Sequence, residues 1–205
     1  MKTIKLVIFL LLSISIIGCS TTGGTIGGLF PAPKFTKGKI NNDIYTSKDK
    51  DFSVSIPHKK GTREFTYLQI KEQYRNTGAY INFGPAALDQ SIYRLEIGKK
   101  LTPENKNNFV LSDAVDAVIE SYSKQLEVTY KSKPELVKKE KILINGFESY
   151  AVNLTQNAPN QTLTHEIIVT DYPTMAVIFW VQESSANSFG ASINALEFAQ
   201  SFKVL

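Results

Sequence analysis

The chain has 205 residues, of which 23 are lysine or arginine and 19 are aspartate or glutamate, giving a formal net charge of +4 at pH 7. Lysine carries most of this small excess, which argues against nucleic-acid binding, since that function favours a clustered basic face with arginine forks. The single cysteine excludes a disulfide within the chain and leaves no thiol pair for redox chemistry.

Residues 1–18 resemble the signal peptide of a bacterial lipoprotein. A positively charged start is followed by an apolar run over residues 6–17, and Gly18 precedes the only cysteine, Cys19. The run is too short to span a bilayer comfortably, and a small residue lies where a peptidase would cut. We therefore predict that Cys19 is lipidated and anchors the chain to a membrane. The alternatives are an ordinary secretory signal with a chance cysteine, or an uncleaved anchor helix.

The next segment, residues 19–39, is predicted to be a flexible tether. It is rich in Gly, Ser and Thr, contains Pro31 and Pro33, and has too few apolar residues to form a core. Ser20, and not an aspartate, follows the cysteine, and the resemblance to Gram-negative lipoproteins then implies the outer membrane, with the chain facing the periplasm. Residues 40–205 are long enough for one domain with its own core.

Within this domain, alternating apolar and polar residues predict strands before and after one clear helix. The predicted strands are 43–47, 52–56, 65–74, 80–83, 91–97, 136–144, 147–154, 163–170 and 175–181. The last of these is apolar on both faces, which predicts a central strand that is covered on both sides.

The Asn145-Gly146 pair predicts a hairpin between two of these strands. A two-residue loop would mix apolar and polar side chains on each face. A three-residue loop over residues 144–146, with a bulge, places Ile142 on the same face as Tyr150. Because register normally follows the apolar face, we predict the three-residue loop.

Two helices complete the predicted elements. Residues 112–127 carry apolar side chains at helical spacing, with Ser112 as the expected N-cap. A second helix is predicted over residues 185–199. Along the chain, several strands come before the first helix and four come between it and the second. This order predicts the α+β class, an antiparallel β-sheet covered by helices.

Three segments of the domain have a familiar pattern: residues 45–57, the hairpin residues 145–150, and the closing helix with Ser201-Phe202. On these segments the domain resembles the PsbP/Mog-type α/β/α sandwich, which has DcrB-like bacterial members. All three are structural motifs. The resemblance therefore implies the sandwich fold and binding to a partner, without a reaction common to the family.

The sequence shows no catalytic or metal-binding motif. The two histidines, His58 and His165, have no second histidine at ligand spacing, and no Gly-x-Ser-x-Gly occurs. A Ser-His-Asp triad can draw its members from distant positions, so both histidines stay open as catalytic candidates. We predict a non-enzymatic domain with no catalytic residue, no metal and no cofactor.

Aromatic residues in irregular segments are the candidates for a partner surface, because clustered exposed aromatics mark interfaces. They are Tyr80, Phe83 and Phe109, together with Phe30 and Phe35 of the tether. The leading hypothesis is a lipid-anchored envelope domain that binds a protein or assists envelope assembly. The alternative is a module that binds a small molecule or lipid between the sheet and its helices.

Overall fold

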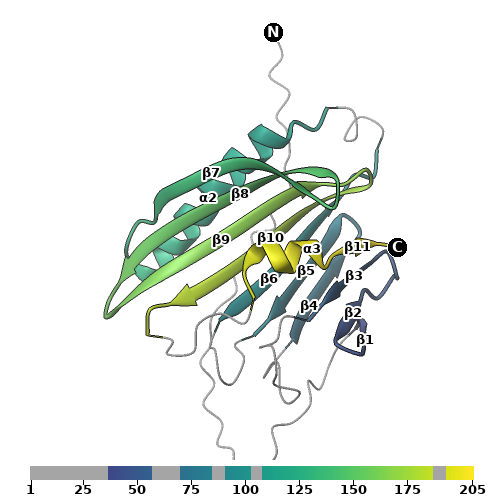
Figure 1. Cartoon of the computed structure of the whole chain (residues 1–205), viewed down its shortest axis with the longest axis horizontal. Coiled ribbons are helices and arrows are strands. Elements are labelled where there is room, and N and C mark those ends of the chain that lie inside the picture. The colour runs from purple at the N-terminus through teal and green to yellow at the C-terminus, as the bar shows by residue number, and fades with distance from the viewer. Residues whose placement is uncertain (1–36, 57–69, 85–90, 103–107, 187–192) are drawn as a thin grey trace, which may run out of the picture.

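The computed structural model describes residues 37–56, 70–84, 91–102, 108–186 and 193–205 (Figure 1). Within these residues the chain forms two antiparallel sheets and two helices. The predicted signal peptide with Cys19, nearly all of the predicted tether, and His58 lie outside the described residues.

The two sheets differ in size. The small sheet has the spatial order β1 (Lys39–Asn41), β2 (Ile44–Thr46), β3 (Phe52–Ser55) and β11 (Lys203–Val204). The large sheet has the spatial order β4 (Ile70–Arg75), β5 (Gly78–Phe83), β6 (Ile92–Lys99), β10 (Met175–Ser184), β9 (Gln161–Asp171), β8 (Phe147–Ala158) and β7 (Glu135–Ile144). The helices are α2 (Leu111–Tyr130) and α3 (Ala195–Gln200).

Strand β10 is the middle strand of the large sheet, between β6 and β9. Its consecutive residues Phe179 and Trp180 point to opposite faces of the sheet, and both are buried, so both faces are covered. The predicted central position of this segment is confirmed. A run of apolar β-branched and aromatic residues suits a strand that has no solvent-facing side.

One face of the large sheet packs against the small sheet and α3, and aromatic rings dominate this core. The Phe83 ring lies edge-on to the rings of Tyr45 and Phe198, with centroids 5.9 Å apart in both pairs. Phe52 stacks on Phe202 at 5.4 Å. Edge-to-face and stacked pairs add to the free energy of burial. They join β2, β3 and the C-terminal segment to the large sheet.

Helix α2 covers the other face, across β8, β9 and β10 (Figure 1). Its buried stripe consists of Leu111, Ala114, Val115, Val118, Tyr122 and Leu126, which confirms the predicted amphipathic helix. The predicted cap is wrong. Val110 is the N-cap and makes no side-chain cap bond, and Ser112 lies inside the first turn, where its hydroxyl donates to Asp113.

The β7–β8 hairpin has a two-residue loop, so the predicted three-residue loop is wrong. Ile144 pairs with Phe147, and Asn145 and Gly146 both adopt positive φ, 52° and 86°. Positive φ at both central residues is typical of a type I′ turn, whose twist matches that of the two strands it joins. Ile144 is the only fully buried residue of β7. The apolar face therefore specifies the register weakly in this edge strand, and the turn determines it.

The predicted α+β class, a sheet covered by helices, is also wrong, because the protein is β-rich. The segments predicted as strands 43–47 and 52–56 do not join the main sheet. With β1 and β11 they form the second sheet, which covers one face of the first. Of the predicted C-terminal helix over 185–199, residues 187–192 lie outside the described residues, Ser185 lies in a turn, and the helix that is described is α3.

Candidate functional site

A row of polar and aromatic side chains crosses the large sheet on the face that α2 covers. Register pairs Asn82 of β5 with Arg94 of β6, and Arg94 with Trp180 of β10. Directly opposed residues project to the same face, so these three side chains are neighbours. The guanidinium carbon of Arg94 lies 4.3 Å from the centroid of the Trp180 ring. We define the arginine cluster as Asn82, Arg94, Glu96, Tyr122, His165 and Trp180.

Aromatic rings surround the guanidinium of Arg94. The ring centroids of Tyr80 and Tyr122 lie 5.2 Å and 5.9 Å from its carbon. Trp180 in turn lies in stacked contact with Tyr122 at 5.9 Å and with His165 at 5.8 Å. The arrangement places a cation against the electron-rich faces of rings, which is favourable where water is scarce.

Glu96 is the nearest carboxylate to Arg94, with one oxygen 3.8 Å from Nη1. This separation is too long for a hydrogen bond. The hydroxyl of Tyr122 donates to the same oxygen at 2.6 Å. Burial raises the pKa of Glu96 above its usual value, although Tyr122 and Arg94 act in the opposite direction.

His165 is fully buried, and its Nε2 lies 3.2 Å from the side-chain oxygen of Gln156. Burial, with a contribution from the positive charge of Arg94, lowers the pKa of His165 to about 4. The imidazole is therefore neutral at pH 7. The structure places this histidine against Trp180, deep in the arginine cluster.

The arginine cluster is short of hydrogen-bond partners. Among the described residues, five buried side-chain polar atoms have no partner, and four belong to the cluster: Asn82 Oδ1, Arg94 Nε, His165 Nδ1 and Trp180 Nε1. Buried polar groups are normally paired, because an unpaired one costs free energy. A concentration of unpaired groups in one place is therefore a functional-site candidate.

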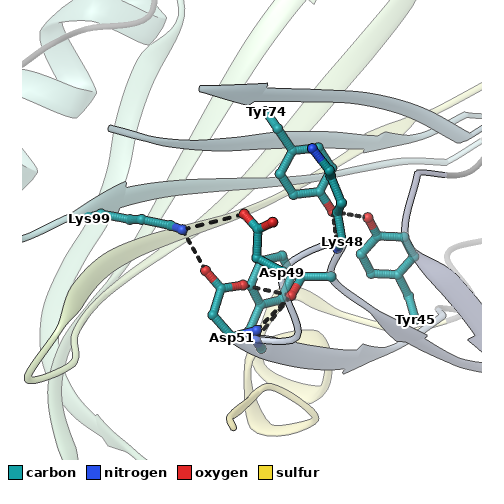
Figure 2. Close-up of polar contacts among 8 residues, drawn as sticks. Tyr45, Lys48, Asp49, Asp51, Tyr74 and Lys99 are labelled. Carbon is teal, nitrogen blue, oxygen red and sulfur yellow. Dashed lines mark hydrogen bonds and ion pairs between the residues drawn. The ribbon is translucent and has the colours of Figure 1, made fainter. Parts of the chain in front are cut away.

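A second polar cluster lies between the two sheets, near the N-terminal end of the described chain (Figure 2). We define the inter-sheet network as Tyr45, Ser47, Asp51, Glu72, Tyr74 and Lys99. The Tyr45 hydroxyl donates to Glu72 and is also hydrogen bonded to Tyr74, whose hydroxyl accepts from the Lys48 backbone N–H at 3.1 Å. Burial, and then the bonds to Glu72 and Tyr74, raise the pKa of Tyr45 above its usual value.

The other end of the inter-sheet network is an ion pair. Lys99 of β6 lies 2.7 Å from Asp51, next to β3, and 3.9 Å from Asp49 (Figure 2). The Ser47 hydroxyl donates to Asp51 at 2.6 Å. Burial alone would raise the pKa of Asp51, but the bonds from Lys99 and Ser47 outweigh it and lower the pKa. This network joins the sheets with paired groups, which fits a structural role.

The structure does not bring the predicted partner-surface residues together. Tyr80 is buried beside Arg94, and Phe83 lies in the core between the sheets. Alternation along β5 places the two on opposite faces. Phe109 is partly buried, with the Lys100 ammonium 4.7 Å from its ring centroid. Phe30 and Phe35 lie outside the described residues.

Reasoning from the sequence missed Arg94 and Glu96. The pattern that could have found them is two charged residues alternating with Tyr93, Leu95 and Ile97 in one strand. Such a face is usually read as solvent-facing. In an interior strand that is covered on both sides, the same alternation buries the charges, and β6 is such a strand.

In the described part of the chain, no group of three or more His, Cys, Asp or Glu side chains is arranged to hold a metal ion. No helix in this part is long and apolar enough to cross a membrane.

No family model and no curated protein matches the sequence, but solved structures do. The solution structure of cyanobacterial PsbP (CyanoP) from Synechocystis is 12% identical, covers 85% of this chain and 100% of its own, and has a TM-score of 0.50. A Bacteroides thetaiotaomicron structure is 10% identical, covers 81% of this chain and 49% of its own, with a TM-score of 0.47. A Pseudomonas aeruginosa protein of unknown function is 12% identical, covers 57% and 84%, and has a TM-score of 0.36.

At these identities a likeness shows the fold alone, and of these three structures the PsbP structure is the one whose TM-score reaches 0.50. The chain has a PsbP-like fold. One fold hosts many functions, so the fold alone does not indicate the role of this protein.

Proposed function

We propose that this protein is a lipid-anchored, non-enzymatic domain of the bacterial cell envelope that binds a protein partner through the edge strand β7. The signal-like residues 1–18 and Cys19 support the anchor, and Ser20 supports the outer membrane with the domain facing the periplasm. The PsbP-like fold is consistent with this class of protein.

The observation that carries the proposal is the exposed apolar edge of the large sheet. Among the described residues, β7 has a strand neighbour on one side only. Leu136, Val137 and Leu143 of this strand are each more than half exposed, Leu143 by 66%. An edge strand offers unpaired backbone groups, and apolar side chains beside them favour the addition of a partner strand.

The charges of β7 indicate what kind of partner fits. Its three lysines each form an ion pair within the same molecule: Lys138 with Glu140, Lys139 with Asp116, and Lys141 with Glu148. The lysine charges of β7 are therefore balanced within the molecule, and the backbone edge, the apolar side chains and Glu135 remain for binding. We propose that the partner is an extended protein segment with alternate apolar residues and little net charge.

Site-specific crosslinking in intact cells tests the binding surface. A photo-reactive residue at Leu143 should give one discrete crosslinked species. The same residue at Val128 should not, because Val128 is 80% exposed but lies on α2, outside the edge strand. Leu143→Lys should weaken the complex about tenfold or more, since it removes an apolar contact. Equal crosslinking from both positions would contradict the proposal.

The anchor is tested separately with Cys19→Ala. This variant should not incorporate labelled palmitate and should be released from membranes or remain an uncleaved precursor. Palmitate labelling of the variant at the wild-type level would show that Cys19 is not the lipidation site.

A further inference from the structure

We propose that the arginine cluster is a binding site for an oxyanion, the carboxylate or phosphate group of a small molecule. This site lies on the α2 side of β5, β6 and β10, and is separate from the proposed partner edge at β7. It would give the protein a second function, the sensing or carrying of an anionic ligand.

The donors of the arginine cluster point to an anion. Arg94 Nε and Trp180 Nε1 carry N–H groups, lie on neighbouring strands, and have no hydrogen-bond partner. The guanidinium lies over the indole ring, so the two groups that carry these N–H bonds are in contact. A guanidinium fork matches the geometry of carboxylate and phosphate oxygens. Asn82 Oδ1 only accepts, and so does His165 Nδ1 when Nε2 of the neutral imidazole donates to Gln156, so these two atoms would pair with a protonated oxygen of the ligand and add no attraction for its charge.

A cationic ligand does not fit this place. The ring faces that would attract a cation already surround the guanidinium of Arg94. Glu96 does not saturate that guanidinium, because its nearest oxygen is 3.8 Å away and already accepts a hydrogen bond from the Tyr122 hydroxyl. Arg94 therefore keeps a positive charge that no close carboxylate hydrogen bond neutralises.

The arginine cluster combines low solvent exposure with some access. The side chains of Arg94 and Glu96 are 13% and 20% exposed, so the cluster is not fully closed to solvent. The rest of the site is walled by Trp180 and Tyr122, which are buried. In surroundings of low polarity, a charge-assisted hydrogen bond is stronger than in water.

Fluorescence of Trp180 tests the proposal directly, because it is the only tryptophan of the chain and lies on Arg94. The full-length lipid-anchored protein in detergent is titrated with inorganic phosphate and, separately, with succinate, while chloride keeps the ionic strength constant. We expect a saturable change with at least one probe. Phosphate alone would identify a phosphate ligand, and succinate alone a carboxylate ligand. No change with either probe, or an equal change with chloride, would overturn the proposal.

Variants then assign the binding to Arg94. Arg94→Gln should weaken binding about tenfold or more, because it removes a charged donor. Glu96→Gln should tighten it several-fold, because a nearby negative charge is lost. Arg75→Gln is the matched control, since Arg75 lies on the same sheet but is exposed, and it should bind as the wild type does.

A fold defect in Arg94→Gln is checked by its melting temperature. If the variant does not fold, Arg94→Lys keeps the charge but lacks the fork, and its affinity should still fall. Wild-type affinity in a folded Arg94 variant, or an equal loss in Arg75→Gln, would overturn the proposal.

Discussion

Strand β6 contributes to two polar clusters on opposite faces of the large sheet, and the two are built differently. Toward the small sheet, Lys99 joins the inter-sheet network, in which it pairs with Asp51. Toward α2, Arg94 joins the arginine cluster, in which its Nε has no partner. The same strand thus carries one saturated and one unsaturated cationic site.

This difference separates a structural site from a candidate binding site. In the inter-sheet network, the buried polar groups bond to one another, so the cost of burying them is offset within the protein. In the arginine cluster, four buried atoms lack partners, so no hydrogen bond within the protein offsets the free-energy cost of removing them from water. Unpaired buried groups of this kind are expected where a ligand completes the bonding.

The largest expected effect is at Glu72, in the inter-sheet network. Its carboxylate accepts bonds from the Tyr45 hydroxyl and from the backbone N–H groups of Lys37 and Gly38. Glu72→Ala leaves these donors unpaired, and we expect the free energy of unfolding to fall by about 3 kcal/mol. Chemical denaturation measures this loss. Gln73→Ala, an exposed position on the same strand, is the control and should have little effect.

The second prediction is that acid lowers the free energy of unfolding, through protonation of His165 in the arginine cluster. The folded protein holds the pKa of His165 at about 4, against 6.5 in an ordinary environment. Between these values the unfolded chain binds a proton that the folded chain does not. The stability is therefore fully present above pH 6.5 and falls as the pH drops toward 4, by up to about 3 kcal/mol.

His165→Gln should remove this part of the acid sensitivity, as measured by unfolding at a series of pH values. A wild-type pH profile in His165→Gln would assign the acid sensitivity to other groups.

The third prediction concerns where the domain begins. Residues 40–205 were predicted to form the domain, but Gly38 is buried against β2, where an added Cβ would lie 2.4 Å from the Thr46 carbonyl oxygen. Its N–H also bonds to Glu72 at 2.9 Å. A variant lacking residues 1–39 should be less stable than one lacking residues 1–36, by about 2 kcal/mol. Equal melting curves would show that these contacts do not stabilise the domain.

Local pattern predicted much of the fold. Alternation and apolar runs located the segments of most strands in the described residues, the central position of 175–181, and the helix from 112. These features depend on nearest neighbours along the chain. The hairpin loop was mispredicted because β7 has too few buried residues for its apolar face to determine the register.

The second sheet and the candidate site depend on contacts between distant residues. The sequence of residues 43–56 does not indicate which sheet these strands join, because β3 pairs with Lys203 and Val204 at the far end of the chain. Alternation alone does not show what covers the face of Arg94 and Glu96, because that depends on the strands that flank β6. Sequence alone therefore predicted strands better than the site that they build.

The smallest expected change in the free energy of unfolding gives the most direct test of the difference between the inter-sheet network and the arginine cluster. Replacing Arg94 by Met and Glu96 by Gln removes both charges of the arginine cluster and keeps similar side-chain volumes. Because both charges are removed together, neither is left buried without its opposite, so the free energy of unfolding should change by less than about 1 kcal/mol. Phosphate or succinate binding should nevertheless be lost. A fall as large as that of Glu72→Ala would mean that the arginine cluster also stabilises the fold, and the distinction between the two clusters would fail.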